Sequence, residues 1–171
     1  GAQMKAAGKS GARLMVLLAT NLFSYFTNDF NAGLVLSGSA QGVAATNNAL
    51  ATGQPGEPNH AGKATNLLSA DITSLWFSWV APGAGVATFS TRGSTFDTVL
   101  AAYTGDTIGG LTLKAADDDQ GDFGTSTIKF NVEKTNTYRI AVAGYNSATG
   151  HIVLSWNLEI VTGSSGIPFV P

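Results

Sequence analysis

The sequence predicts an all-β protein, an antiparallel β-sandwich preceded by an apolar N-terminal extension. From residue 72 onward, apolar and polar residues alternate in short runs separated by turn formers, which is typical of half-buried strands. The chain of 171 residues has 21 glycines, 5 prolines and 44% apolar residues, so it can form a core but is too rich in turn formers to be mainly helical. No stretch of about 10–15 residues with helical periodicity separates the runs, which argues against parallel βαβ units.

The strands are predicted, in order, at 72–81, 86–91, 96–104, 111–116, 125–132, 138–142 and 152–160. The last of them has the clearest pattern, because apolar residues from Ile152 to Ile160 alternate with polar or smaller ones, which predicts one buried face. Residues 37–71 are rich in small and polar residues and show weak periodicity. Within them, 54–62 is predicted to be a loop because it contains two prolines and two glycines.

The N-terminal segment differs in character from the rest of the chain. Lys5, Lys9 and Arg13 precede an apolar run, which is the order of charge and hydropathy in a secretory signal. No small-x-small cleavage site follows Leu22, so we expect the segment to be retained. Its spacing suits either a helix or a buried strand. We predict that it adds to the sheet of a second copy, through Leu14, Val16, Leu18, Leu22 and Phe23.

Composition excludes several classes of function. The chain has no cysteine, which excludes disulfides, Cys-ligated metals and thiol nucleophiles. Nine dispersed basic residues and a net charge of -2 argue against nucleic acid as a partner. The sequence contains no apolar run of about 18 residues, so it predicts no transmembrane helix. The nucleophile motif Gly-x-Ser-x-Gly is missing, so we expect no enzymatic activity.

The densest charge in the chain lies at 117–122, where Asp117, Asp118, Asp119 and Asp122 fall within one loop beside a glycine. Ca²⁺ prefers several oxygen ligands from a flexible loop, so this segment is a candidate calcium site. The alternative is an acidic, solvated loop whose aspartates serve turns.

Two further groups of residues have a functional and a structural interpretation. Glu57 and His60 could form a ligand or general-base cluster, or they could belong to a rigid loop held by two prolines. Aromatic residues could stack on sugars or pack in the core, and Tyr145, in a Gly-Tyr-Asn turn, is the best candidate for an exposed ring.

Several motifs together resemble the bacterial pre-peptidase C-terminal type domain. They are NDFNA at 28–32, VLSG at 35–38, GEPNHAG at 56–62, LWFSW at 75–79, FDTVL at 96–100, YTG at 103–105 and YRIAVAGY at 138–145. The resemblance covers about residues 28–160 and is moderately specific, because each motif is weak alone. The first 27 residues have no counterpart in the family.

The resemblance implies a jelly-roll-like sandwich, exported and non-catalytic, of a kind appended to secreted hydrolases and surface proteins. Several such domains hold calcium, and acids at the matching motifs add Asp97 and Glu57 as distant ligands. We therefore expect an apolar extension at 1–27, a sandwich at 28–162 and a tail at 163–171.

Two functions follow as expectations for an extracellular or cell-surface protein. The first is a structural or adhesive subunit that self-assembles into a homo-oligomer or filament through its N-terminal segment, because head-to-tail contacts propagate. The second is a calcium-dependent accessory module of a secreted hydrolase that binds protein or polysaccharide.

Overall fold

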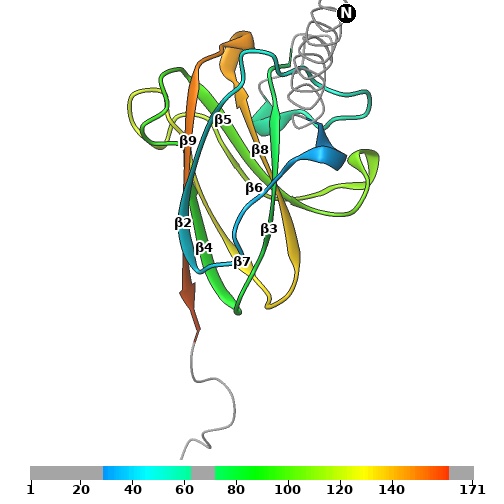
Figure 1. The fold of residues 1–171 in the computed structure, drawn as a ribbon, viewed down its shortest axis with the longest axis vertical. Coiled ribbons are helices and arrows are strands. Elements are labelled where there is room, and N and C mark those ends of the chain that lie inside the picture. Colours follow the sequence, from blue (N-terminus) through cyan, green and yellow to red (C-terminus); the bar gives the residue numbers. More distant parts are fainter. Residues whose placement is uncertain (1–28, 63–71, 162–171) are drawn as a thin grey trace, which may run out of the picture.

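The computed structural model describes residues 29–62 and 72–161, and it confirms the predicted β-sandwich (Figure 1). One sheet has five strands in the order β1-β3-β8-β5-β6, and the other has four in the order β2-β9-β4-β7. The strands are β1 Leu34–Val35, β2 Gln41–Asn47, β3 Leu75–Val80, β4 Gly85–Ser90, β5 Thr98–Thr104, β6 Thr112–Asp117, β7 Thr127–Val132, β8 Thr137–Gly144 and β9 His151–Ile160. Short 3-10 turns are η1 Phe30–Ala32, η2 His60–Gly62, η4 Ile108–Gly110 and η5 Tyr145–Ser147.

Strand pairing is antiparallel throughout the described residues except at one edge, where the short strand β1 runs parallel to β3. The last strand, β9, lies between β2 and β4, so the sheet joins segments that are far apart in the sequence. Residues 1–27 and 163–171 lie outside the described residues. The first of these segments contains the five positions predicted to contact a partner. In the described part of the chain, no helix is long and apolar enough to cross a membrane.

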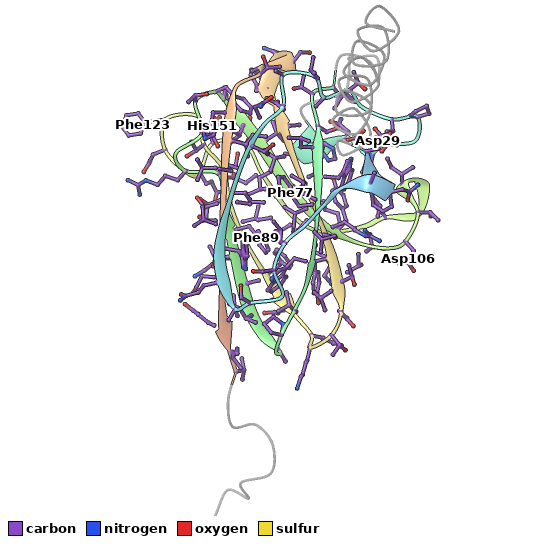
Figure 2. The ribbon with its side chains drawn as sticks, viewed as in Figure 1. Asp29, Phe77, Phe89, Asp106, Phe123 and His151 are labelled. Carbon is purple, nitrogen blue, oxygen red and sulfur yellow. The ribbon has the colours of Figure 1, made fainter. Side chains whose placement is uncertain are left out.

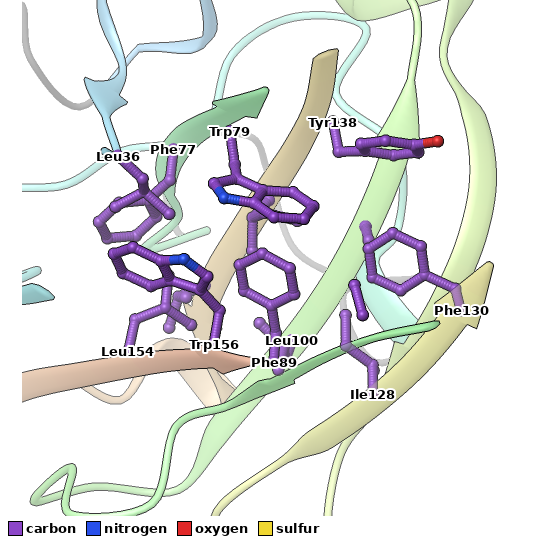
Figure 3. Close-up of a cluster of buried hydrophobic side chains, with 14 of the residues drawn as sticks. Leu36, Phe77, Trp79, Phe89, Leu100, Ile128, Phe130, Tyr138, Leu154 and Trp156 are labelled. Atoms are coloured by element: carbon purple, nitrogen blue, oxygen red, sulfur yellow. The ribbon is translucent and has the colours of Figure 1, made fainter. Parts of the chain in front are cut away.

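The main core lies between the two sheets (Figure 3). The alternation predicted for the last strand is confirmed, because Ile152, Leu154, Trp156 and Leu158 are all buried. Opposite them, Trp79 of β3 is completely buried and packs edge-on against Phe89. Burial of such side chains removes apolar surface from water and is the main favourable term in folding.

A second, smaller core covers the outer face of the five-stranded sheet. It contains Phe30, Trp76, Ala101, Tyr103 and Ala141. Phe30 belongs to η1 and meets the indole of Trp76 edge-on at 5.1 Å. Strands β3 and β5 are therefore buried on both faces over most of their length.

Strand β2 occupies part of the region in which the sequence shows weak periodicity. Its residues alternate between exposed and half-buried, but the half-buried ones are small. Gly42 is required by packing, since a Cβ atom there would come within 2.2 Å of the Trp156 ring. Small residues thus leave room for the indole. Because they are only weakly apolar, the sequence shows no clear alternation from which this strand could be predicted.

Candidate functional site

Three of the predicted metal ligands converge at one end of the sandwich. Carboxylate oxygens of Asp97, Asp118 and Asp119 lie within 4.8 Å of one another. Asp97 immediately precedes β5, and Asp118 and Asp119 immediately follow β6. The donor set consists of oxygen alone, from two connections, which is the chemistry that a hard cation such as Ca²⁺ prefers.

Buried hydroxyl groups hold these two connections together. The Ser126 hydroxyl lies 2.6 Å from the carbonyl oxygens of both Thr98 and Asp118. The Thr91 hydroxyl is 2.6 Å from that of Thr98 and accepts the Ser126 backbone N–H at 2.8 Å. Because buried polar groups are costly to leave unpaired, this network fixes the backbone that carries Asp97 and Asp118.

A third segment joins the same end of the molecule. The Tyr145 N–H donates to the Asp97 carbonyl oxygen at 2.9 Å, so η5 is tied to the start of β5. The Thr98 N–H donates to the Gly124 carbonyl oxygen at 2.8 Å. Gly124 has a left-handed backbone with φ of 72°, which glycine adopts without steric cost.

The other predicted ligands are not in this group of three carboxylates. Asp117 is buried, and its Oδ2 accepts the backbone N–H groups of Gln120 at 3.0 Å and Thr127 at 2.8 Å. It therefore shapes the loop as the last residue of β6. Asp122 lies in the β6–β7 connection with a left-handed backbone, φ 65°. Glu57 bonds to His60 in a separate cluster.

Left-handed backbone conformations concentrate around the three aspartates. Asp122 and Phe123 in one connection, and Asn146 and Ser147 in another, all have positive φ between 48° and 65°. Such conformations cost free energy in residues other than glycine and gather at functional sites more often than elsewhere.

An aromatic side chain that the sequence analysis did not select stands out beside this end. Phe123 is fully exposed, at 101%, and points away from the molecule (Figure 2). Tyr145, which the sequence did select, is 36% exposed. The acidic and glycine residues around Phe123 were the available signal, because residues of these types are typical of exposed turns.

Glu57 and His60 form a buried hydrogen-bonded cluster with Tyr103. His60 Nε2 is 2.8 Å from Glu57 Oε1, and His60 Nδ1 is 2.7 Å from the Tyr103 hydroxyl oxygen. The second carboxylate oxygen of Glu57 accepts the Gln54 N–H at 2.7 Å, and the Gln54 side-chain oxygen accepts the Phe30 N–H at 2.7 Å. The cluster links the 54–62 loop to β5 and to the chain before β1.

Burial decides between the two interpretations of this cluster. The side chains of Glu57 and His60 are each 1% exposed, so within residues 29–62 and 72–161 neither offers an open surface to a substrate. Burial, with a smaller effect of the Glu57 charge, raises the pKa of Tyr103 well above its ordinary value. Burial and then the Glu57 charge also raise the pKa of Asp29. The cluster is a structural clamp on the second core.

The chain is similar in fold to several solved structures. No protein-family model matches the chain. No curated protein matches it.

Among solved structures, PliG of Aeromonas hydrophila, a periplasmic inhibitor of g-type lysozyme, is 12% identical with a TM-score of 0.48 over 74% of this chain and 95% of its own. The pre-peptidase C-terminal domain of a Bacillus anthracis collagenase is 11% identical with a TM-score of 0.45, over 72% of this chain and 93% of its own. CorA of Methylomicrobium album BG8, a surface-associated copper-binding protein, is 9% identical with a TM-score of 0.43, over 74% of this chain and 98% of its own. These similarities concern the fold alone.

Proposed function

We propose that this protein is a non-catalytic binding module of the pre-peptidase C-terminal type, working outside the cell or at its surface. It holds Ca²⁺ at Asp97, Asp118 and Asp119 and binds a protein or polysaccharide at the same end of the sandwich. The observation that carries this proposal is the convergence of the three carboxylates from the two connections that flank the paired strands β5 and β6. The assignment to this type of domain rests on the sequence motifs.

The cation would act as a cross-link between two loops. Carboxylates at this spacing repel one another, and a divalent ion would offset that repulsion. With the ion bound, the connection that carries Phe123 would be tied more firmly to the start of β5. An ordered loop with an exposed ring loses less conformational entropy when it binds a partner. Calcium would therefore favour ligand binding at this end.

Calcium titration of the full chain tests the proposal. We expect about one Ca²⁺ per chain with a dissociation constant on the order of 0.1–1 mM, the range of extracellular calcium modules. Asp119→Asn should weaken binding by about tenfold, because a ligand charge is lost while this exposed side chain contributes little to folding. Isothermal titration calorimetry measures both quantities.

Asp106→Asn is the matched control, because Asp106 is also exposed and lies on the opposite side of the molecule from Phe123 (Figure 2). Its calcium affinity should equal that of the wild type. Retention on immobilised collagen and polysaccharide, with and without chelator, then tests the ligand. Absence of calcium binding, or equal weakening by both substitutions, would refute the calcium site.

Self-assembly through the N-terminal segment is the second proposed function. The apolar run from Leu14 to Leu18 carries no charge, so it could bury in a second copy without desolvating an ion. Large apolar side chains of this kind contribute about 1.5–3 kcal/mol each when buried, before ordering costs. Head-to-tail contacts of this kind produce open filaments.

Charges placed in that run should abolish such assembly. We expect the full chain carrying Leu14→Lys and Leu18→Lys to lose filaments, because lysine cannot be buried unpaired in an apolar contact. Negative-stain images and light scattering report the change. Filaments that persist in the double variant would contradict an assembly through this segment.

A further inference from the structure

We propose that β2 is a dimerisation edge, at which β2 of a second copy pairs antiparallel about a two-fold axis through Ala44. The two four-stranded sheets would then form one continuous sheet. This inference uses neither the three aspartates nor the N-terminal segment, so it stands apart from both proposed functions. It rests on the direction of the β2 backbone groups, on the self-complementary sequence of the strand and on the protection of the other sheet edges.

The backbone of β2 offers hydrogen-bonding groups on its outer side. Among the described strands, β2 has one neighbour, β9. The Leu158 N–H donates to the Ala40 carbonyl oxygen at 2.6 Å, and the Asn48 N–H donates to the Gly150 carbonyl oxygen at 3.3 Å. Because backbone N–H and C=O groups alternate in direction along a strand, those of the even-numbered residues of β2 point toward β9. The N–H and C=O groups of Val43 and Ala45 therefore point away from the sheet.

The side chains on this edge suit a second copy of the same strand. With Ala44 on the two-fold axis, Val43 of one copy lies opposite Ala45 of the other, and Gln41 lies opposite Asn47. The centre of the contact is apolar and its two ends are amide pairs, so no like charges meet. All four side chains are exposed in the isolated chain, and Val43 is 67% exposed.

The register is also consistent with the backbone. The residues that would pair across the axis are the odd-numbered ones, whose N–H and C=O groups point outward. Each such pair can exchange two backbone hydrogen bonds, as in any antiparallel ladder. A two-fold contact closes on itself, so the product is a dimer and not a filament.

The other sheet edges carry features that discourage pairing, and β2 does not. Edge strands are protected by shortness, charge, bulges or cover. Strand β1 has two residues, β6 carries Lys114 and a register shift against β5, and β7 carries the exposed Lys129. Strand β2 has seven residues and contains no charge and no proline. A long, uncharged edge of this kind is a template for another strand.

The neighbouring surface is also neutral. A groove of about 570 Å³ runs beside β2 over the outer face of the four-stranded sheet. Its lining beyond β2 includes Thr88, Ser90, Ser155 and Asn157, which carry no charge. A second copy placed against β2 would bury no ion in this groove, and the hydroxyl and amide groups there could keep water at the rim of the contact.

A lysine on the edge should separate the two copies. We expect the full chain to show a concentration-dependent monomer–dimer equilibrium in sedimentation velocity, and Val43→Lys to raise the dimer dissociation constant at least about tenfold. Asn131→Lys is the matched control, because Asn131 is exposed on β7, at the opposite edge of the same sheet and outside the groove, so the added charge should leave the equilibrium unchanged. Far-UV circular dichroism checks that both variants fold.

A single cysteine tests the register, since the chain has none of its own. In the proposed pairing the two Ala44 Cα atoms face each other at about 4.5 Å, within disulfide range. The two Ala45 Cα atoms would lie about 8 Å apart, too far for a disulfide. Mild oxidation of the full chain should therefore cross-link Ala44→Cys to a covalent dimer far more than Ala45→Cys.

Several outcomes would overturn the proposal. They are a wild-type chain that stays monomeric at millimolar concentration, equal effects of Val43→Lys and Asn131→Lys, and equal cross-linking at positions 44 and 45. If Leu14→Lys with Leu18→Lys abolishes all association while Val43→Lys has no effect, the N-terminal segment is the contact and the β2 proposal fails. If the double variant retains a dimer that Val43→Lys removes, the β2 proposal holds.

Discussion

Replacing Trp79 with alanine should lower the free energy of unfolding by about 3–5 kcal/mol, the range for large aromatic side chains removed from a core. The indole is completely buried, packs against Phe89 at 5.4 Å and Tyr138 at 6.1 Å between ring centroids, and donates its Nε1–H to the Ser39 carbonyl oxygen at 3.2 Å. Alanine would leave a cavity between the sheets. Urea unfolding followed by far-UV circular dichroism measures the loss.

Val80→Ala is the control for that measurement. Val80 is the next residue of β3 and is 44% exposed, so its substitution should change the free energy of unfolding by only about 0.5 kcal/mol or less. Equal effects of the two substitutions would mean that the core does not depend on the indole.

His60→Ala should lower the free energy of unfolding by about 3–5 kcal/mol, because it removes one hydrogen-bond partner from each of two buried groups, a carboxylate and a hydroxyl, at about 1–3 kcal/mol each and more for the charged group. Glu57 Oε1 would lose its contact with Nε2, and the Tyr103 hydroxyl would lose its contact with Nδ1. Chemical unfolding again gives the free energy, and the change should exceed that of Tyr103→Phe, which removes one hydrogen bond of about 1 kcal/mol.

The second histidine provides the reference for this prediction. His151 begins β9 and is exposed, so His151→Ala should be almost neutral. Adding Glu57→Gln to His60→Ala should recover part of the lost stability by removing the buried charge that the imidazole no longer contacts. A His60→Ala variant as stable as His151→Ala would show that the cluster does not clamp the loop.

The strands with strong alternation were predictable from sequence, and those with small residues were not. In β9, large apolar side chains recur at every second position, and in the structure these side chains form one buried face of the strand. In β2, Gly42 and Ala44 fill the inward positions, so the pattern carries little hydropathy contrast. The space those residues leave is filled by Trp156, from a strand more than 100 residues away in sequence.

The alternation of apolar and polar residues was not enough to predict that β3 and β5 are buried on both faces. Alternation places Trp76 and Tyr103 opposite the main core, where a solvent-facing position is the simple expectation. The structure buries them because Phe30 and His60 come from distant segments to cover that face. Such cover is a property of the tertiary fold, and its one local sign in β5 is the uninterrupted apolar run from Val99 to Tyr103.

The candidate site could be predicted as a neighbourhood but not atom by atom. Four aspartates within six residues indicated the loop, yet adjacent carboxylates on a turn point in different directions. Asp117 turns back to backbone N–H groups, while Asp118 and Asp119 approach Asp97. Spacing cannot separate these cases, because the outcome depends on where β5 begins relative to the end of β6.

The central position of β9 sets a condition on biosynthesis. A ribosome makes β2 and β4 long before it makes β9, which pairs with both of them. Until residue 160 has emerged, the four-stranded sheet lacks its middle strand, and both neighbours expose backbone groups that another nascent chain could capture. Completion of the domain must therefore wait for the synthesis of β9, and it then proceeds at the slow rates of folds built from distant pairings, milliseconds to seconds.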